Sequence, residues 1–192
     1  MVGLPVRGTS APVKRPVVTA LLLGLALVPA PARADVSSWL YVAPGYSWTK
    51  QGDEATASQP ALQLDTGLGT SPKHAIIFGG ILHWQTHFGR GTDLGLLMRT
   101  ATHGFVNGGW GAALDLGGYE RWWELGSAGG MGQLVLGAPW GITLAAGAGA
   151  GTNDGRHYSA TIGVDLARLT VYRRTGDRYW KNPFPAYRPE ED

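Results

Sequence analysis

The chain has 192 residues, no Cys, 30 Gly and 16% charged residues, against roughly 25% charged residues in soluble domains. The lack of Cys excludes disulfides and a lipoprotein anchor, and no sustained basic stripe with interleaved aromatic residues supports nucleic-acid binding. The net charge of +2 comes from the first 34 residues, which hold 4 of the 16 Lys and Arg and none of the 14 acids, so residues 35–192 carry a charge of −2.

The first segment has the three parts of a secretory signal peptide. Arg7, Lys14 and Arg15 precede an uncharged run at 17–30, and small residues at 32 and 34 match the pattern that a signal peptidase reads. The run is shorter than the ~20 residues that a membrane helix needs. We therefore expect residues 1–34 to be a signal peptide and the protein to be exported.

After this segment, large apolar residues alternate with small or polar ones at the period of a β-strand. In AIIFGGILHWQTHF (75–88), for example, Phe78, Leu82 and Trp84 fall on one face and His83 on the other. The same pattern recurs along the chain, which predicts eight strands at 39–48, 61–69, 75–88, 92–99, 110–116, 133–140, 142–151 and 158–167.

Turn residues separate the predicted strands. The longest connection is expected at 49–60, with further connections near 71–73, 89–92, 106–109, 126–130 and 152–155 and a tight turn at 138–141. No helical period competes with the strand pattern after residue 34. The chain is therefore predicted to be all-β.

The residue types indicate which face of the strands is outside. The even-numbered face is apolar and has no charge in the body of any strand, whereas the odd-numbered face is mostly Gly and Ala with isolated Asp, Gln and His. A Lys or Arg that faces lipid costs roughly 2–4 kcal/mol at the membrane midplane. The pattern thus predicts an eight-stranded antiparallel up-and-down transmembrane β-barrel with a narrow polar interior.

Large aromatic residues fall near the predicted strand ends, where membrane barrels carry girdles at both interfaces. The predicted girdle consists of Trp39, Trp48, Trp84, Phe88, Trp110, Trp122, Trp140, Tyr158 and Tyr172.

In these features the chain resembles the small eight-stranded outer-membrane β-barrel proteins of Gram-negative bacteria, over residues 38–172. The resemblance implies an outer-membrane location, contact with outer-membrane lipids and assembly by the barrel-assembly machinery, which would meet the strand at 161–172. It also implies a monomer, and 49–60 becomes the first outer loop. We assign residues 35–175 to the barrel and the Pro-rich residues 176–192 to an extended or disordered tail.

Nine polar residues on the odd-numbered face are predicted to form a network in the lumen: Asp65, His83, Gln85, Asp93, Arg99, Asp115, Tyr119, Arg121 and Asp165. Buried charges need partners, and strand adjacency brings Asp93 near Arg121, while Arg99 can pair with Asp115 or with a carboxylate across the lumen. The network could act as a selectivity constriction or as acid and base. A structural plug is favoured, because an eight-stranded barrel is only just wide enough for its own side chains.

The spacing of the His residues argues against a metal site. His83 and His87 would lie about 13 Å apart on a strand, at ~3.3 Å per residue, so one ion cannot bind both, and we predict no metal and no cofactor. His87 and the segment 157–159 (His-Tyr-Ser) lie near the outer rim, but no spacing of a nucleophile and a base marks them. No enzyme activity is therefore expected.

The sequence favours a structural or surface-interaction role through the outer loops. Three alternatives remain open: a narrow pore or small-ligand conduit, a soluble exported lipocalin-like barrel with the even-numbered face inside, and a lipid-modifying enzyme at the rim.

Overall fold

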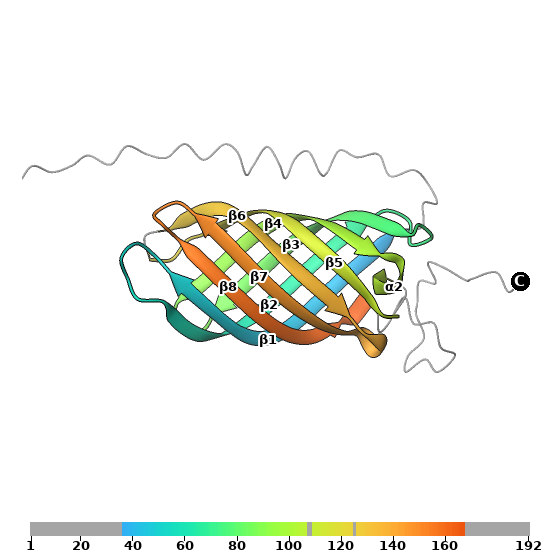
Figure 1. Cartoon of the computed structure of the whole chain (residues 1–192), viewed down its shortest axis with the longest axis horizontal. Coiled ribbons are helices and arrows are strands. Elements are labelled where there is room, and N and C mark those ends of the chain that lie inside the picture. The colour runs from blue at the N-terminus through green and yellow to red at the C-terminus, as the bar shows by residue number, and fades with distance from the viewer. Residues whose placement is uncertain (1–35, 107–108, 125, 168–192) are drawn as a thin grey trace, which may run out of the picture. The chain divides into compact units, whose positions relative to one another are not determined.

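The computed structural model describes residues 36–106, 109–124 and 126–167. They form a closed barrel in which each strand pairs antiparallel with its neighbours in the sequence and β1 pairs with β8 (Figure 1). The strands are β1 (Ser37–Lys50), β2 (Ala57–Gly69), β3 (Ile76–His87), β4 (Gly91–Thr102), β5 (Gly111–Arg121), β6 (Ser127–Gly137), β7 (Ile142–Gly151) and β8 (Arg156–Asp165). The predicted all-β, eight-stranded, up-and-down barrel is confirmed.

Two short helical turns complete the described residues, α2 (His103–Val106) and the 3-10 turn η1 (Pro139–Gly141). Neither these nor any other helix in the described ranges is long and apolar enough to cross a membrane. The predicted signal peptide, the tail at 176–192 and Tyr172 lie outside the described residues.

The connections divide between two ends of the barrel. We call the end with the β2–β3, β4–β5 and β6–β7 connections the α2 end, and the other the four-turn end (right and left in Figure 1). The β4–β5 connection (103–110), which contains α2, is longer than the β1–β2 connection (51–56). The prediction that 49–60 is the longest connection is therefore wrong, because strand pairing continues to Thr49 opposite Ala57.

The prediction of a connection at 126–130 is also wrong, since β6 begins at Ser127. Gly129 pairs with Gly151 of β7, and a Cβ at Gly129 would lie 2.1 Å from the carbonyl oxygen of Ala150. The glycine that looked like a turn signal thus permits close approach of two strands inside the barrel.

Burial alternates along every strand as the sequence pattern predicts. In β2, for example, Gln63 and Asp65 are fully buried, while Leu62 and Leu64 are each 38% exposed. The odd-numbered side chains fill the interior and the even-numbered ones cover the outside. The fold is therefore partly inverted relative to a soluble protein, because charged and amide groups lie inside beside an apolar cluster while many large apolar groups cover the outside.

Inward glycines should be intolerant of side chains. A Cβ at Gly163 would lie 2.1 Å from the carbonyl oxygen of Val42 and 2.5 Å from the Cα of Ala43, so Gly163→Ala must push two strands apart. We expect the free energy of unfolding to fall by roughly 1–3 kcal/mol, measured as a lower urea midpoint in detergent micelles. Gly80→Ala is the matched control, because its Cβ would meet nothing within 4 Å. Equal midpoints for the two variants would contradict the packing.

Candidate functional site

The interior holds a central network built around an arginine and two carboxylates. Arg99 on β4 donates two hydrogen bonds of 2.7 Å to Asp115 on β5, from Nε to Oδ1 and from Nη2 to Oδ2. The Nη2 atom of Arg99 also lies 4.0 Å from Oδ2 of Asp65 on β2. All three side chains are at most 1% exposed, so the fork-shaped guanidinium neutralises charge that water cannot reach.

Amide and imidazole groups connect these charges across the lumen. Gln133 on β6 donates through Nε2 to Asp65 at 2.8 Å and to Asp115 at 2.7 Å. Gln63 donates to Asp65 at 2.7 Å and to the Gln133 oxygen at 2.9 Å. The Nδ1 atom of His83 on β3 lies 2.6 Å from Oδ1 of Asp65. Asp65 is therefore the residue on which most of the network converges.

Two hydroxyl groups extend the central network to the remaining wall. Thr161 on β8 donates to Oε1 of Gln63 at 2.9 Å, and the Tyr41 hydroxyl on β1 lies 3.1 Å from the Thr161 oxygen. Every strand except β7 thus contributes a side chain to one connected set. On β7, Gly147 supplies space instead, since a Cβ there would lie 2.8 Å from Oγ of Ser159.

A second set of buried polar groups, which we call the rim network, lies toward the four-turn end. Arg121 donates from Nη2 to Asp93 at 2.7 Å and from Nε at 2.9 Å, and Nε1 of Trp123 donates to the same carboxylate at 2.9 Å. The Arg121 guanidinium also lies 4.3 Å from the Trp123 ring centroid. The predicted pairings of Asp93 with Arg121 and of Arg99 with Asp115 are both confirmed.

The rim network includes a serine, a histidine and an aspartate in series. Oγ of Ser47 lies 2.7 Å from Nδ1 of His87, and Nε2 of His87 lies 3.1 Å from Oδ2 of Asp93. These groups have the chemistry of a nucleophile, a base and an orienting carboxylate. However, Ser47 is fully buried, and Trp123 packs on the His87 ring with a centroid distance of 5.4 Å.

The other predicted lumen residues are also buried, and the Arg121 guanidinium of the rim network lies 6.0 Å from the Tyr119 ring centroid. Tyr119 packs edge-on against His157 at 4.8 Å. Gln85 is fully buried between its register partners Gln63 and Asp93, without a hydrogen bond from its side-chain amide in the described part of the chain. Asp165 accepts hydrogen bonds from the backbone N–H groups of Leu40 and Ala167 toward the α2 end.

One predicted girdle residue is misplaced: Trp39 lies inside the barrel and is only 1% exposed. The Arg99 guanidinium lies 5.2 Å from the Trp39 ring centroid and 5.4 Å from that of Phe105 in α2. Strand parity explains the error, because Trp39 is odd-numbered and shares the inner face with Tyr41. The two rings cover the charged centre on the side of the α2 end by cation–π contact.

The remaining described girdle residues face outward, with exposures of 38% or more, in two groups. Trp110 and Trp140 lie at the α2 end, and the others lie toward the four-turn end: Trp48, Trp84, Phe88, Trp122 and Tyr158.

Several interior residues were not singled out from the sequence. Gln63, Gln133, Ser47 and Thr161 carry the odd-numbered parity of the inner face, which is the only sequence signal that could have marked them. Phe105 carries no such signal, because α2 interrupts the strand period.

No group of three or more His, Asp or Glu side chains that could hold a metal ion occurs within residues 36–106, 109–124 and 126–167. Comparisons of the chain with protein-family models, with curated proteins and with solved structures found no match. The class that the fold defines is therefore a small, closed, eight-stranded β-barrel with a polar, hydrogen-bonded interior.

Removing the central arginine should be costly. Arg99→Met leaves Asp115 without its ion-pair partner and removes the guanidinium 4.0 Å from Asp65. We expect a loss of roughly 3–5 kcal/mol of unfolding free energy, measured by urea titration. The control Arg90→Gln breaks the exposed Arg90–Glu124 ion pair and should cost at most about 1 kcal/mol. Adding Asp115→Leu to Arg99→Met should recover part of the loss, and similar costs for the Arg99 and Arg90 variants would refute the assignment.

Proposed function

We propose that this barrel spans the outer membrane of a Gram-negative bacterium as a monomeric, non-catalytic structural protein. The observation that carries the proposal is the inversion of the fold. Large apolar side chains such as Phe78 (54% exposed) and Leu144 (51% exposed) cover the outside, while arginines and aspartates fill the inside. In water, exposed apolar side chains are unfavourable, whereas in a bilayer they contact lipid favourably.

The distribution of outward charges supports the same proposal. In the described strands, the outward-facing charged residues are Lys50, Glu120 and Arg156, which lie at or one residue from the strand ends at the four-turn end. Between the two aromatic groups the outer wall is uncharged, as a lipid-facing band has to be. Export through the predicted signal peptide, assembly by the barrel-assembly machinery and contact with outer-membrane lipids belong to this proposal.

The structural role is favoured over surface recognition because the connections at the four-turn end are short. The longest of them covers residues 51–56, so little chain is available to form a binding surface there. A pore is less favoured because the central network crosses the lumen from wall to wall. Discrete current steps in planar bilayers would favour a pore.

A soluble lipocalin-like barrel is the alternative in which the protein is not inserted in a membrane. It would bind its ligand in an open cavity, whereas hydrogen-bonded charged and amide side chains cross the interior here, beside buried apolar residues such as Ile81 and Leu97. Recovery of the mature protein in a soluble periplasmic fraction without detergent would favour this alternative.

The membrane proposal predicts a depth-dependent cost of charge on the outer wall. Leu82 lies midway along β3 and is 40% exposed, so Leu82→Arg should destabilise the membrane-inserted barrel by roughly 2–4 kcal/mol. Phe88→Arg, at the end of the same strand, should cost no more than about 1 kcal/mol. The readout is the fraction of folded protein in lipid vesicles, followed by the gel shift between unheated and heated samples.

For a soluble barrel both substitutions would add a charge to a wet surface and leave folding unchanged. Equal folding of Leu82→Arg and the parent protein in detergent-free buffer would therefore overturn the proposal.

The second candidate function is a lipid-modifying hydrolase at the rim, which the series Ser47, His87 and Asp93 favours. The complete burial of Ser47 opposes it, because a nucleophile has to reach its substrate. We expect a fluorophosphonate probe to leave Ser47 unmodified, as judged by peptide mass spectrometry with a serine hydrolase as positive control. Labelling of the parent protein that is lost in Ser47→Ala would instead establish the enzyme.

A further inference from the structure

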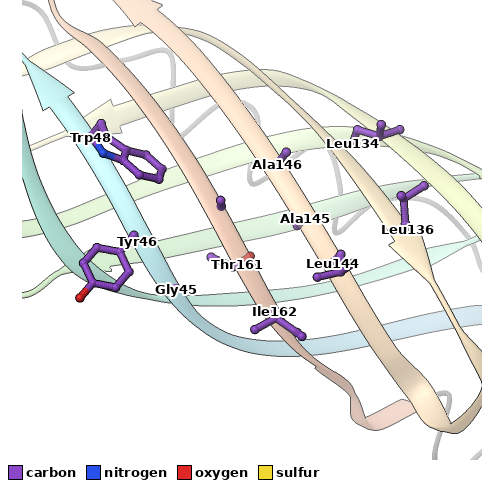
Figure 2. A pocket seen from close by; sticks show the side chains of 11 residues that line it. Gly45, Tyr46, Trp48, Leu134, Leu136, Leu144, Ala145, Ala146, Thr161 and Ile162 are labelled. Atoms are coloured by element: carbon purple, nitrogen blue, oxygen red, sulfur yellow. The ribbon is translucent and has the colours of Figure 1, made fainter.

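An apolar groove of about 540 Å³ runs over the outer wall of β1, β8, β7 and β6. Ala146 and Ala160 are the small residues among its lining. Larger side chains border it, with Tyr46 and Trp48 on one side and Leu134 on the other (Figure 2). Tyr46 pairs with Ala160, Ala160 with Ala146, and Ala146 with Leu134. These four register partners form one row across β1, β8, β7 and β6, and the other lining residues belong to the rows next to it.

Two cationic side chains lie beyond the end of the groove that is nearest the four-turn end. Lys50 on β1 and Arg156 on β8 are direct register partners, two residues beyond the pair formed by Trp48 and Tyr158. All four are even-numbered and share the outer face. Like charges directly opposite each other on neighbouring strands destabilise a sheet, and an anion bound between them would relieve that cost.

The dimensions of the wall fit one lipid molecule. From Arg156 to the row of Ile162, Leu144 and Leu136 there are six residues, about 20 Å along a strand. With a strand tilt of about 40° this is about 15 Å of depth, close to half of the ~30 Å hydrocarbon core. The cation pair and the groove together therefore span about the depth of one leaflet, with the aromatic pair at the level of the interface.

We infer that this wall binds one membrane lipid with a negatively charged phosphate headgroup, whose phosphate lies between Lys50 and Arg156 and whose acyl chain lies in the groove over Ala160. The inference rests on the proposed membrane location. One neighbouring residue opposes phosphate binding, because Oδ1 of Asp154 lies 3.4 Å from Nη2 of Arg156 and competes with the phosphate. Asp154→Asn should therefore strengthen binding.

The test is native mass spectrometry of the barrel in detergent with equal amounts of phosphatidylglycerol and phosphatidylcholine that carry the same acyl chains. The parent protein should retain phosphatidylglycerol preferentially. Each of Lys50→Gln and Arg156→Gln should lower the preference by about fivefold. Ala160→Leu should reduce retention of both lipids by filling the groove.

Two variants serve as matched controls. Arg90→Gln removes a cation at the same end of the barrel but on the β3–β4 connection, away from the groove. Gly80→Leu places a leucine side chain on the outer face of β3, away from the groove, where a Cβ meets no neighbour within 4 Å. Both should retain phosphatidylglycerol like the parent protein.

Flotation with vesicles of phosphatidylcholine alone is measured first, which separates the two proposals. A barrel that does not float would overturn the membrane proposal together with the lipid site. A barrel that floats but retains both lipids equally, or whose preference survives both charge substitutions, would overturn the lipid site alone. A dimer that Ala160→Leu dissociates would assign the groove to a second copy of the chain and likewise overturn it.

Discussion

The need to pair charge inside a narrow closed barrel is the constraint on which the rest of this structure depends. Arg99 and Asp115 form a two-pronged hydrogen-bonded pair, and the amide of Gln133 links that pair to Asp65 on the far wall. An unpaired charge in such a place would be far more costly than one at the surface. A glutamine at position 133 serves this pairing, because an apolar residue there would leave both carboxylates without its amide donor. The network shares the interior with a cluster of buried apolar side chains that includes Ile77, Ile81 and Leu97.

The glycines follow from the same constraint. A lumen that holds arginine, histidine and tyrosine side chains needs space along its wall, and the inward glycines of β7 provide it. A Cβ at Gly149 would lie 2.3 Å from the His157 ring, and one at Gly151 would lie 2.8 Å from the Tyr119 hydroxyl oxygen. The polar interior and the apolar exterior are two results of one packing arrangement.

Much of this arrangement could be predicted from alternation alone, because the side of a strand on which a residue lies depends only on parity. That rule put His83 and Arg99 inside and Leu82 outside, as observed. It failed where position near a strand end was given more weight than parity, as for Trp39. It also could not anticipate α2, whose Phe105 enters the barrel from a segment without strand period. Glycine at Gly129 was misread because the same residue type permits both turns and close strand contact.

The number of strands, the polar face of each and the origin of Asp93 and Arg121 on neighbouring strands all follow from the sequence pattern. These properties depend on local period and chain order. Only the tertiary structure decided which groups meet across the lumen, such as Gln133 with Asp65, and that the outer walls of β1 and β8 bring Lys50 beside Arg156. Such contacts depend on barrel closure and on the relative heights of distant strands, which no period within a single strand encodes.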